Sequence, residues 1–363
     1  TLICLAATAS LLNACSAGDD ATAEQTPQAT TVSFSGTASV GTSADATRGY
    51  FGDATVGSPL GAYTWESSDV IKAAVYDATA TPAKFLASGS DYSWAATVTP
   101  TEGNATSAKI YWTQALTDFN AGNTNTHLLF SAPTGTTVDA TATKLAVTYN
   151  LTPTFTGAAE NSLTHLKNYS FIYAQQSAFT GTKSETAMTF TYIPALIRFA
   201  IANGNAAPVN IQSVKMTCST ALFPTSAQYS LSSTSTTFAP VSGYTPSSTV
   251  ADVSVNLTTA ATVASGAYTR LYAAVLPTAA FATDATFTFT ITTSDGTYTS
   301  NKITGAQLAA DWKTTNVGSG TDTATDLFRS GKSYTFKLWF DNVKGLTFAS
   351  SSAMLGWTSE TDL

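Results

Sequence analysis

Short runs of alternating apolar and polar residues make up most of the chain. In residues 32–40, Val32, Phe34, Ala38 and Val40 alternate with Ser and Thr, the period-two pattern of a strand with one buried face. Runs of similar texture recur, with Gly, Pro, Asn and Asp between them, including "AKIYW", "KLAVTYNLTPTF", "YTRLYAAVLP" and "ATFTFTITTSDGTYTS". Only residues 305–312 and parts of 113–121 could form short helices, because no stretch sustains a 3.6-residue period. The pattern predicts an all-β fold.

The spacing of these runs predicts two tandem β-sandwich domains of Greek-key or transthyretin-like topology, with few short helices. The polar stretch "QSAFTGTKSET" links two apolar runs and indicates a domain boundary within it. We therefore expect domains at residues 49–182 and 183–363, preceded at 16–48 by a small-residue tether and a first strand. The clearest hairpin runs from Phe287–Ile291 to Asp295-Gly296, a dipeptide suited to a type I′ turn.

The first fifteen residues read as an export signal. The apolar run "LICLAATASLLNAC" is too short to span a bilayer but suits the core of a signal peptide. Its end, Leu12-Asn13-Ala14-Cys15, resembles the bacterial lipobox, in which the Cys becomes the lipidated start of the mature protein. Residues 1–15 are therefore a predicted lipoprotein signal peptide, Cys15 is the candidate for palmitate and related acyl chains, and these chains would hold the protein to a membrane. An ordinary secretory signal with a chance Cys is the alternative.

Composition narrows the classes of function. Charged residues make up 11% of the chain, against roughly 25% in typical soluble domains, so the surface is rich in hydroxyl groups. The net charge of −7 and sixteen scattered cations argue against nucleic acid as a partner, because phosphate binding needs clustered Lys and Arg. The first cation is Arg48, within the Gly-flanked linker "ADATRGYFG", and the next is Lys72.

Residues able to carry chemistry are few. Cys218 is the only thiol beyond the first fifteen residues and is interpreted as a buried apolar residue in a strand. The two His residues follow no zinc-binding pattern. Trp65, Glu66 and Asp69 could suggest a sugar-cleaving carboxylate site, but no second acid cluster matches them, so a half-buried Trp beside a solvated turn is the preferred interpretation. We expect no enzyme activity, no cofactor and no metal.

One short motif suggests a covalent modification. Asp322-Thr323-Ala324 resembles the O-glycosylation sequon of Bacteroidota, which makes Thr323 a candidate acceptor.

Longer segments resemble a known family. "HLKNYSFIYAQQ", "AMTFTYIPALIRFAIANG" and "VNIQSVKM" are similar to the central signature of fimbrillin-like lipoproteins, with Tyr192 where that family commonly has His and with Pro194 after it. "YAAVLP", "FRSGKSYTFKLWF" and the terminal "GWT" resemble the C-terminal half of the same family. The resemblance covers nearly the whole chain, and its motifs are apolar patterns.

This resemblance implies a subunit of a type V fimbria that supports adhesion to an unidentified target. Such subunits reach the outer membrane as lipoproteins, and an Arg-specific protease removes the lipid together with the first strand. In this chain the cut would fall between Arg48 and Gly49, and the removed strand would contain Val32, Phe34, Ala38 and Val40. Other copies of the chain, or other fimbrial subunits, would be its partners.

Removal of this first strand would leave an apolar groove in the remaining sheet. Burying Val32, Phe34 and Val40 should be worth roughly 1.5–3 kcal/mol each, and the lost strand would leave ladder hydrogen bonds open to strand addition. Five tail residues are candidates to fill the groove of a neighbour: Leu346, Phe348, Met354, Leu355 and Trp357. The alternative is that the tail closes its own sheet and Arg48 is a solvated loop residue.

A second class of function stays open from the sequence. The chain could be a monomeric surface lipoprotein that binds glycan or another ligand through exposed aromatic residues such as Trp65, Trp94 or Trp112. Such residues belong to the core more often than to a binding platform. It could also be an uncut anchor of a fimbria that keeps its lipid.

Overall fold

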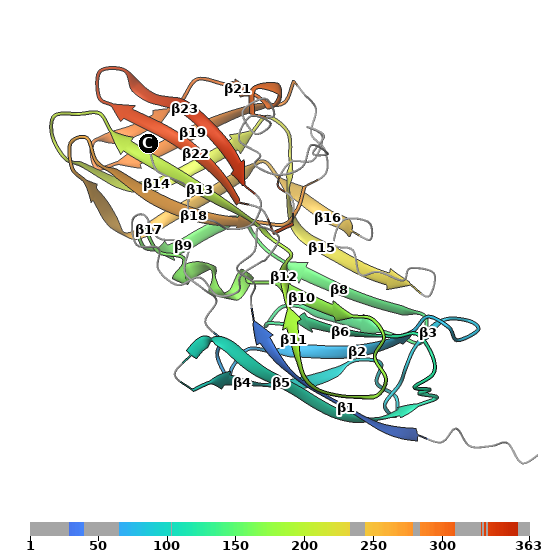
Figure 1. Ribbon diagram of the computed structural model, residues 1–363. Coiled ribbons are helices and arrows are strands. Elements are labelled where there is room, and N and C mark those ends of the chain that lie inside the picture. The colour runs from blue at the N-terminus through green and yellow to red at the C-terminus, as the bar shows by residue number, and fades with distance from the viewer. Residues whose placement is uncertain are drawn as a thin grey trace, which may run out of the picture.

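A computed structural model of the chain describes residues 29–39, 65–102, 104–232, 244–278, 284–308, 328, 330–331 and 333–354. Two lobes built almost wholly of strands are stacked one above the other (Figure 1). The predicted all-β class is confirmed, since several sheets pack as β-sandwiches.

The first lobe is built on a nine-stranded sheet with the order β11-β1-β5-β4-β2-β6-β10-β12, and β3 pairs with β2. Ring centres of Phe34 in β1 and His127 in β6 lie 4.3 Å apart, so the two halves of this sheet face one another across a core. The strands are β1 (Ala29–Ser39), β2 (Ile71–Asp77), β3 (Lys84–Phe85), β4 (Trp94–Thr101), β5 (Asn104–Thr117), β6 (Asn125–Ser131), β10 (Ile172–Gln176), β11 (Thr182–Thr189) and β12 (Thr191–Tyr192).

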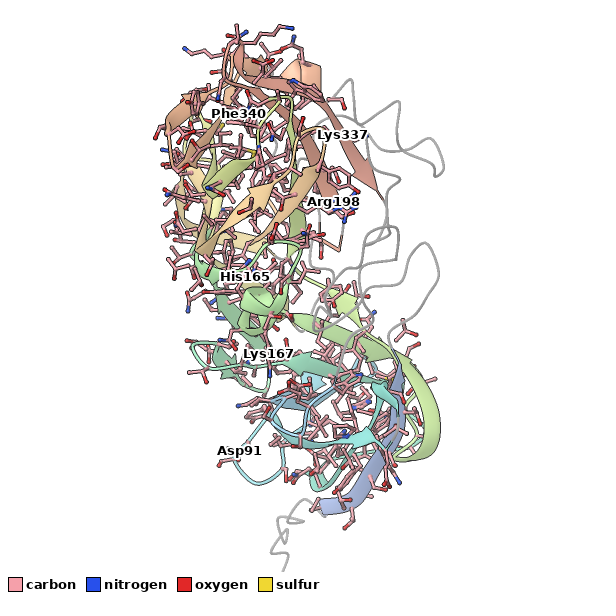
Figure 2. All side chains as sticks on the ribbon, turned by 90° about the vertical axis from the view of Figure 1, so that its left-hand side faces the viewer. Asp91, His165, Lys167, Arg198, Lys337 and Phe340 are labelled. Atoms are coloured by element: carbon pink, nitrogen blue, oxygen red, sulfur yellow. The ribbon has the colours of Figure 1, made fainter. Side chains whose placement is uncertain are left out.

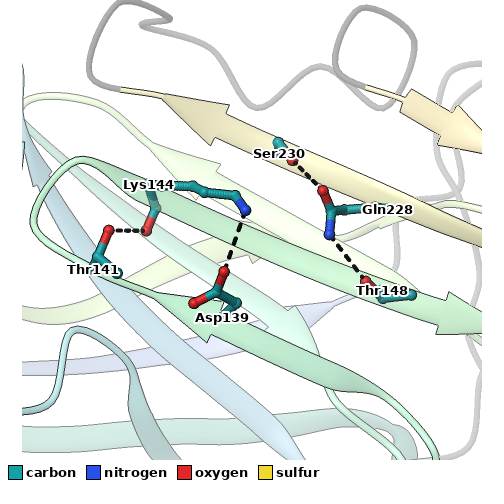
Figure 3. Close-up of polar contacts among 6 residues, drawn as sticks. All are labelled: Asp139, Thr141, Lys144, Thr148, Gln228 and Ser230. Atoms are coloured by element: carbon teal, nitrogen blue, oxygen red, sulfur yellow. Dashed lines mark hydrogen bonds and ion pairs between the residues drawn. The ribbon is translucent and has the colours of Figure 1, made fainter.

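A four-stranded sheet in the order β16-β15-β8-β7 lies beside this core. Its strands are β7 (Thr137–Ala140), β8 (Lys144–Asn150), β15 (Phe223–Ser232) and β16 (Tyr244–Val250). Figure 3 shows polar contacts on this sheet, where Lys144 Nζ lies 3.2 Å from Asp139 Oδ2 and Gln228 Nε2 donates to Thr148 Oγ1 at 3.4 Å. The Lys144–Asp139 pair is exposed and should add no more than about 1 kcal/mol to stability.

The second lobe packs two sheets, β18-β13-β22-β23 and β20-β19-β14-β17-β9, with β21 on β19. All nine residues of β13 are buried, and its apolar run lies between parallel β22 and antiparallel β18. The core holds Phe289, whose ring centre lies 5.1 Å from Phe336 and 6.3 Å from Phe199. The strands are β9 (Thr154–Ala158), β13 (Ala195–Asn203), β14 (Val209–Cys218), β17 (Asp252–Val263), β18 (Tyr268–Val275), β19 (Thr286–Thr293), β20 (Gly296–Thr299), β21 (Ile303–Thr304), β22 (Ser333–Asp341) and β23 (Gly345–Met354).

Strand pairings cross the domain boundary expected near residue 182. β9 precedes that residue yet pairs with β17 of the second lobe, whereas β11 starts there and pairs with β1 of the first. β15 also returns to pair with β8. Each lobe therefore takes strands from both sides of residue 182, and the sequence division at that point stays a prediction.

The structure differs from the sequence-based expectation for helices at two places. Residues 113–117, considered as part of a short helix, belong to β5, where pairing with β1 favours the extended backbone. A 3₁₀ helix at Thr164–Tyr169 (η1) was not expected from the sequence. Within the region expected to be helical at 305–312, residues 305–308 form a helical turn, and the rest lies outside the described residues.

The hairpin expected before Gly296 is present, with its turn one residue earlier than predicted. Thr293 pairs with Gly296, so Ser294 and Asp295 form the two-residue loop. Cys218 ends β14 and is buried, as the sequence indicated.

A buried carboxylate fixes the loops at one end of the first lobe. Asp77, at the end of β2, is 1% exposed. Its Oδ1 accepts hydrogen bonds from Thr79 N and Oγ1, both at 2.9 Å, and from Ala80 N at 3.1 Å, while Oδ2 accepts one from Asn123 Nδ2 at 2.6 Å. Burial, the largest single influence, would raise the pKa of Asp77, but these hydrogen bonds together outweigh it and lower the pKa.

We expect Asp77→Asn to lower the free energy of unfolding by about 1–3 kcal/mol at pH 7, because the neutral amide has one acceptor oxygen where the carboxylate uses two. A lowered folded-state pKa stabilises the protein above the unfolded pKa, and this contribution is lost as pH falls through the folded value. The difference between wild type and variant should therefore shrink below about pH 4. Urea unfolding at pH 7 and pH 3 measures it.

Asp118→Asn is the matched control, since Asp118 is 46% exposed in a surface pair with Lys84. Its effect should stay within about 0.5 kcal/mol. Equal losses for the two variants at pH 7 would contradict the role given to Asp77.

Candidate functional site

The first strand of the described chain lies in the interior of a sheet. β1 runs antiparallel to β5 through eleven residue pairs, from Ala29 opposite Thr117 to Ser39 opposite Ser107. On its other side it runs parallel to β11 through seven pairs. Two ladders therefore hold β1, and its absence would leave β5 and β11 with facing, unpaired edges.

The inner face of β1 is buried from Val32 to Ala38. Val32 and Phe34 are 1% exposed and Ala38 is fully buried, while Gly36 supplies the remaining inward position. Thr37 on the outer face is exposed. The period-two pattern read from the sequence therefore places one apolar face on the core. We call the space between β5 and β11 that β1 fills the first-strand slot.

Aromatic rings form the floor of the first-strand slot. Phe34 packs on His127 and stacks with Trp112, with ring centres 6.4 Å apart in the second pair. Trp112 Nε1 donates a hydrogen bond to His127 Nε2 at 2.8 Å, and Phe179 packs against both of these rings. Because Nε2 accepts this bond, the imidazole is in the tautomer protonated at Nδ1. The floor thus has one fixed polar link within an apolar cluster.

A glycine shapes the entrance beside Val32. Gly181 has a φ of +95°, and its carbonyl oxygen accepts a hydrogen bond from Ser33 N at 2.8 Å. A Cβ at this position would lie 2.6 Å from Phe119 Cε1 and 3.3 Å from Val32 Cγ1. Both the backbone conformation and the close packing therefore require glycine.

The described part of the C-terminal tail closes its own sheet. β23 pairs antiparallel with β22 through nine residue pairs, the last being Ser333 with Met354, and has no other strand partner among the described elements. Leu346 is 5% exposed, and the ring of Phe348 stacks on Phe289 with centres 5.6 Å apart. β23 is therefore an edge strand held by one ladder.

Several residues singled out from the sequence lie outside the described part of the chain. They include the candidate lipidation and cleavage residues and parts of both candidate strands: Cys15, Val40, Arg48, Gly49, Thr323, Leu355 and Trp357.

The aromatic residues considered as a ligand-binding platform belong to the core. Trp65, Trp94 and Trp112 are 2%, 6% and 4% exposed, so none of them can stack on a ligand at the surface. This agrees with the general preference of large aromatic residues for the core. That part of the alternative function is wrong.

The acidic residues beside Trp65 have structural partners. Glu66 forms an ion pair with Lys167, and Asp69 Oδ2 accepts a hydrogen bond from Glu66 N at 2.9 Å. Among the described residues, no group of three or more His, Cys, Asp or Glu side chains is placed to hold a metal ion. Within the same part of the chain, no helix has the length and apolar character needed to cross a membrane.

The sequence matches the model of a family described as fimbrillin-like over residues 47–353. None of the curated proteins is similar enough to count as a match.

Solved structures with a similar chain course include three from Bacteroidales. A candidate cell adhesion protein from Bacteroides ovatus has 15% identity and a TM-score of 0.45, with 92% of this chain and 99% of that chain covered. The tip fimbrial protein Mfa3 from Porphyromonas gingivalis, truncated at its C-terminus, has 11% identity and a TM-score of 0.42, with 90% and 99% covered. A fimbrial protein from Bacteroides vulgatus has 13% identity and a TM-score of 0.41, with 81% and 94% covered.

The buried face of β1 gives a direct stability test. Phe34→Ala should lower the free energy of unfolding by about 3–5 kcal/mol, because it leaves a cavity over the ring floor. Thr37→Ala, on the exposed face of the same strand, should change it by less than about 0.5 kcal/mol. Urea unfolding of the full chain measures both, and similar values for the two variants would show that β1 is not seated in the sheet.

Proposed function

The chain belongs to the fimbrillin-like family, and we propose that it is a structural subunit of a cell-surface fimbria that supports adhesion. In this proposal the chain is exported as a lipoprotein lipidated at Cys15, is cut after Arg48, and polymerises when a strand of another subunit fills the first-strand slot. The observation that supports it most is the position of β1, an N-terminal strand with two ladders and a buried apolar face.

Loss of β1 would create a strong acceptor site. Val32 and Phe34 contribute roughly 1.5–3 kcal/mol each through burial, and their loss would expose the ring floor to water. The backbone groups of β5 and β11 that now pair with β1 would also lose their partners. An extended strand with matching apolar side chains would restore both contributions, as in other cases of strand addition.

The sequence places a single cation between β1 and the folded body. Arg48 is the only Lys or Arg in the first 71 residues, so an Arg-specific protease has one cleavage site there. That site lies nine residues after Ser39, the end of β1, and precedes Trp65, where the described body resumes. One cut would therefore separate β1 and the lipid from everything that follows.

β23 repeats the pattern of β1 in the same chain direction. Both strands have an apolar residue, a hydroxyl residue and a Phe in succession, then small residues. The inward positions of β1 and their proposed counterparts are Val32 and Leu346, Phe34 and Phe348, Gly36 and Ser350, and Ala38 and Ser352. A donated β23 in this register would run parallel to β11, as β1 does.

The number of ladders favours this exchange. β23 has nine pairs with β22 in its own chain, whereas β1 has eleven pairs with β5 and seven with β11. A strand that leaves the edge of one sheet for the first-strand slot therefore gains a second ladder. The opposing cost is the uncovered edge of β22 and the lost contact between Phe348 and Phe289. In this arrangement the partners are other copies of the chain or other fimbrial subunits.

One observation favours a second candidate function, an uncleaved surface lipoprotein or fimbrial anchor. β1 fills its slot and β23 covers β22 within a single chain, so the uncut protein needs no neighbour for either sheet. Such a chain would keep its lipid and stay at the outer membrane.

Treatment of the lipoprotein with an Arg-specific protease separates the two candidates. We expect a new N-terminus at Gly49 and a ladder of multimers on gels run without boiling. Arg48→Lys keeps the charge but removes the cleavage site, so this variant should stay intact and monomeric. A wild-type protein that resists cleavage at Arg48, or that is cut and stays monomeric, would rule out the polymerising subunit.

A peptide of residues 345–357 tests the donor register without changing the donor lobe. It should raise the thermal midpoint of the cut protein, because a ligand that binds only the folded form stabilises it by about 2.7 kcal/mol at one hundred times its Kd. The same peptide with Phe348→Ala should raise the midpoint much less. Uncut protein, with its slot filled, is the control, and an equal rise in uncut protein would contradict binding in the slot.

A further inference from the structure

A polar pocket lies near the level at which the two lobes meet. Figure 2 shows Lys167, one of its lining residues, at this level. The cavity has a volume of about 550 Å³, within the roughly 300–1,000 Å³ typical of small-molecule sites. Four parts of the chain line it: Ser68, Asp69 and Val70 before β2, Pro133 and Thr134 between β6 and β7, Asn150 at the end of β8, and Lys167, Asn168 and Tyr169 in η1.

We call this cavity, with the nine lining residues just named, the waist pocket. Hydrogen bonds hold its walls in place. Lys167 donates to Glu66, and this hydrogen bond is the main reason that the pKa of Glu66 is lowered. Asn150 Nδ2 donates to the carbonyl oxygen of Gly135 at 2.8 Å, and Ala132 N donates to that of Val70 at 2.8 Å. A wall fixed in this way can orient a ligand without first becoming ordered.

Polar groups without protein partners point to a ligand rich in hydroxyl groups. Among the described residues, the side chains of Thr134 and Asn168, which are exposed, and of Tyr169, which is half-buried, form no hydrogen bonds within the protein. The hydroxyl of Ser170, in a smaller cavity that shares Asp69, Val70 and Lys167 with the waist pocket, is buried and also has no partner there. Each of these groups can both donate and accept, which suits the hydroxyl groups of a sugar.

Charge and apolar surface narrow the ligand class further. The only cation of the described lining, Lys167, is already paired with Glu66, so a phosphate, sulfate or acidic sugar would have to compete with that carboxylate. Val70, which is 48% exposed, together with Pro133 and the partly exposed ring of Tyr169, offers apolar contact. A sugar ring has C–H faces that pack on such surfaces and a hydroxyl edge for the polar groups.

We propose that the waist pocket binds a short neutral saccharide. This inference goes beyond a role as a fimbrial subunit, and it does not depend on the first-strand slot, because the pocket is present in the uncut chain. It also gives the segment around Glu66 and Asp69 a part in a binding site without any catalytic step.

An array of neutral and acidic glycans, probed with the uncut full chain, tests this proposal. We expect binding to at least one neutral glycan. For that glycan, Asn168→Ala should weaken affinity by about tenfold, since it removes a donor and an acceptor from the lining. Thr134→Trp should abolish binding by filling the cavity. Asn301→Ala removes an exposed asparagine of the second lobe and should leave affinity unchanged.

The thermal midpoint of each variant must match that of wild type, so that a loss of glycan binding does not reflect misfolding. If one pocket variant misfolds, the other alone tests the proposal. Absence of binding to every glycan, binding to acidic glycans alone, or neutral-glycan binding that survives both pocket variants would overturn the proposal. None of these results would alter the expected cleavage and multimer ladder, so failure here is distinct from failure of the fimbrial function.

Discussion

The double pairing of β1 with β5 and β11 is the interaction on which the first lobe depends. β11 has no strand partner other than β1 among the described elements, so its place in the sheet is set by the chain's first strand. β11 also leads through β12 into β13, the buried strand between β18 and β22 in the second lobe. The N-terminal strand therefore fixes both an edge of its own sheet and the path by which the chain enters the other lobe.

β1 and β23 differ in how their removal would affect the sheets around them. Withdrawal of β23 opens one ladder and uncovers Phe289, whereas withdrawal of β1 opens two ladders and exposes the rings of Trp112 and His127. A vacant first-strand slot would thus bind an added strand more strongly than the uncovered edge of β22 would. As the donor, β23 would be released more easily than β1, because only one ladder holds it. On the proposed exchange, this asymmetry gives assembly its direction, from the tail of one subunit to the slot of another.

The alternation of apolar and polar residues predicted the strands and the all-β class. Most of the features that it did not predict depend on pairing between strands far apart in the sequence. The alternation in β1, β4 and β19 is visible in the sequence because each strand has one face on a core. Nothing in the sequence of β9 indicates that it pairs with β17, about a hundred residues later, since both sides of the boundary share one texture. Likewise, the aromatic residues considered as a platform are core because strands distant in sequence cover their second face.

The same limit applies to the sites. Glu66 and Asp69 drew attention beside Trp65, but the other walls of the waist pocket come from Asn150 and Asn168, more than eighty residues away and in no recognisable motif. The sequence predicted more of the first-strand slot, because the alternation of Val32, Phe34 and Ala38 with polar residues already indicated the buried face of β1. What it could not supply was β11 as the second neighbour.

Low charge connects the composition of the chain to strand exchange. Edge strands of soluble proteins are commonly protected by Lys, Glu or Pro, which disfavour pairing with a foreign strand. Neither β1 nor β23 contains any of these residues, and neither carries a charge, so replacing one by the other leaves the electrostatics of the sheet unchanged. On the proposed exchange, a charged residue in β23 would have to be desolvated at each insertion, at a cost of several kcal/mol per ion in a buried position. The small hydroxyl residues of β23 would avoid that cost, in a chain whose charged fraction is only 11%.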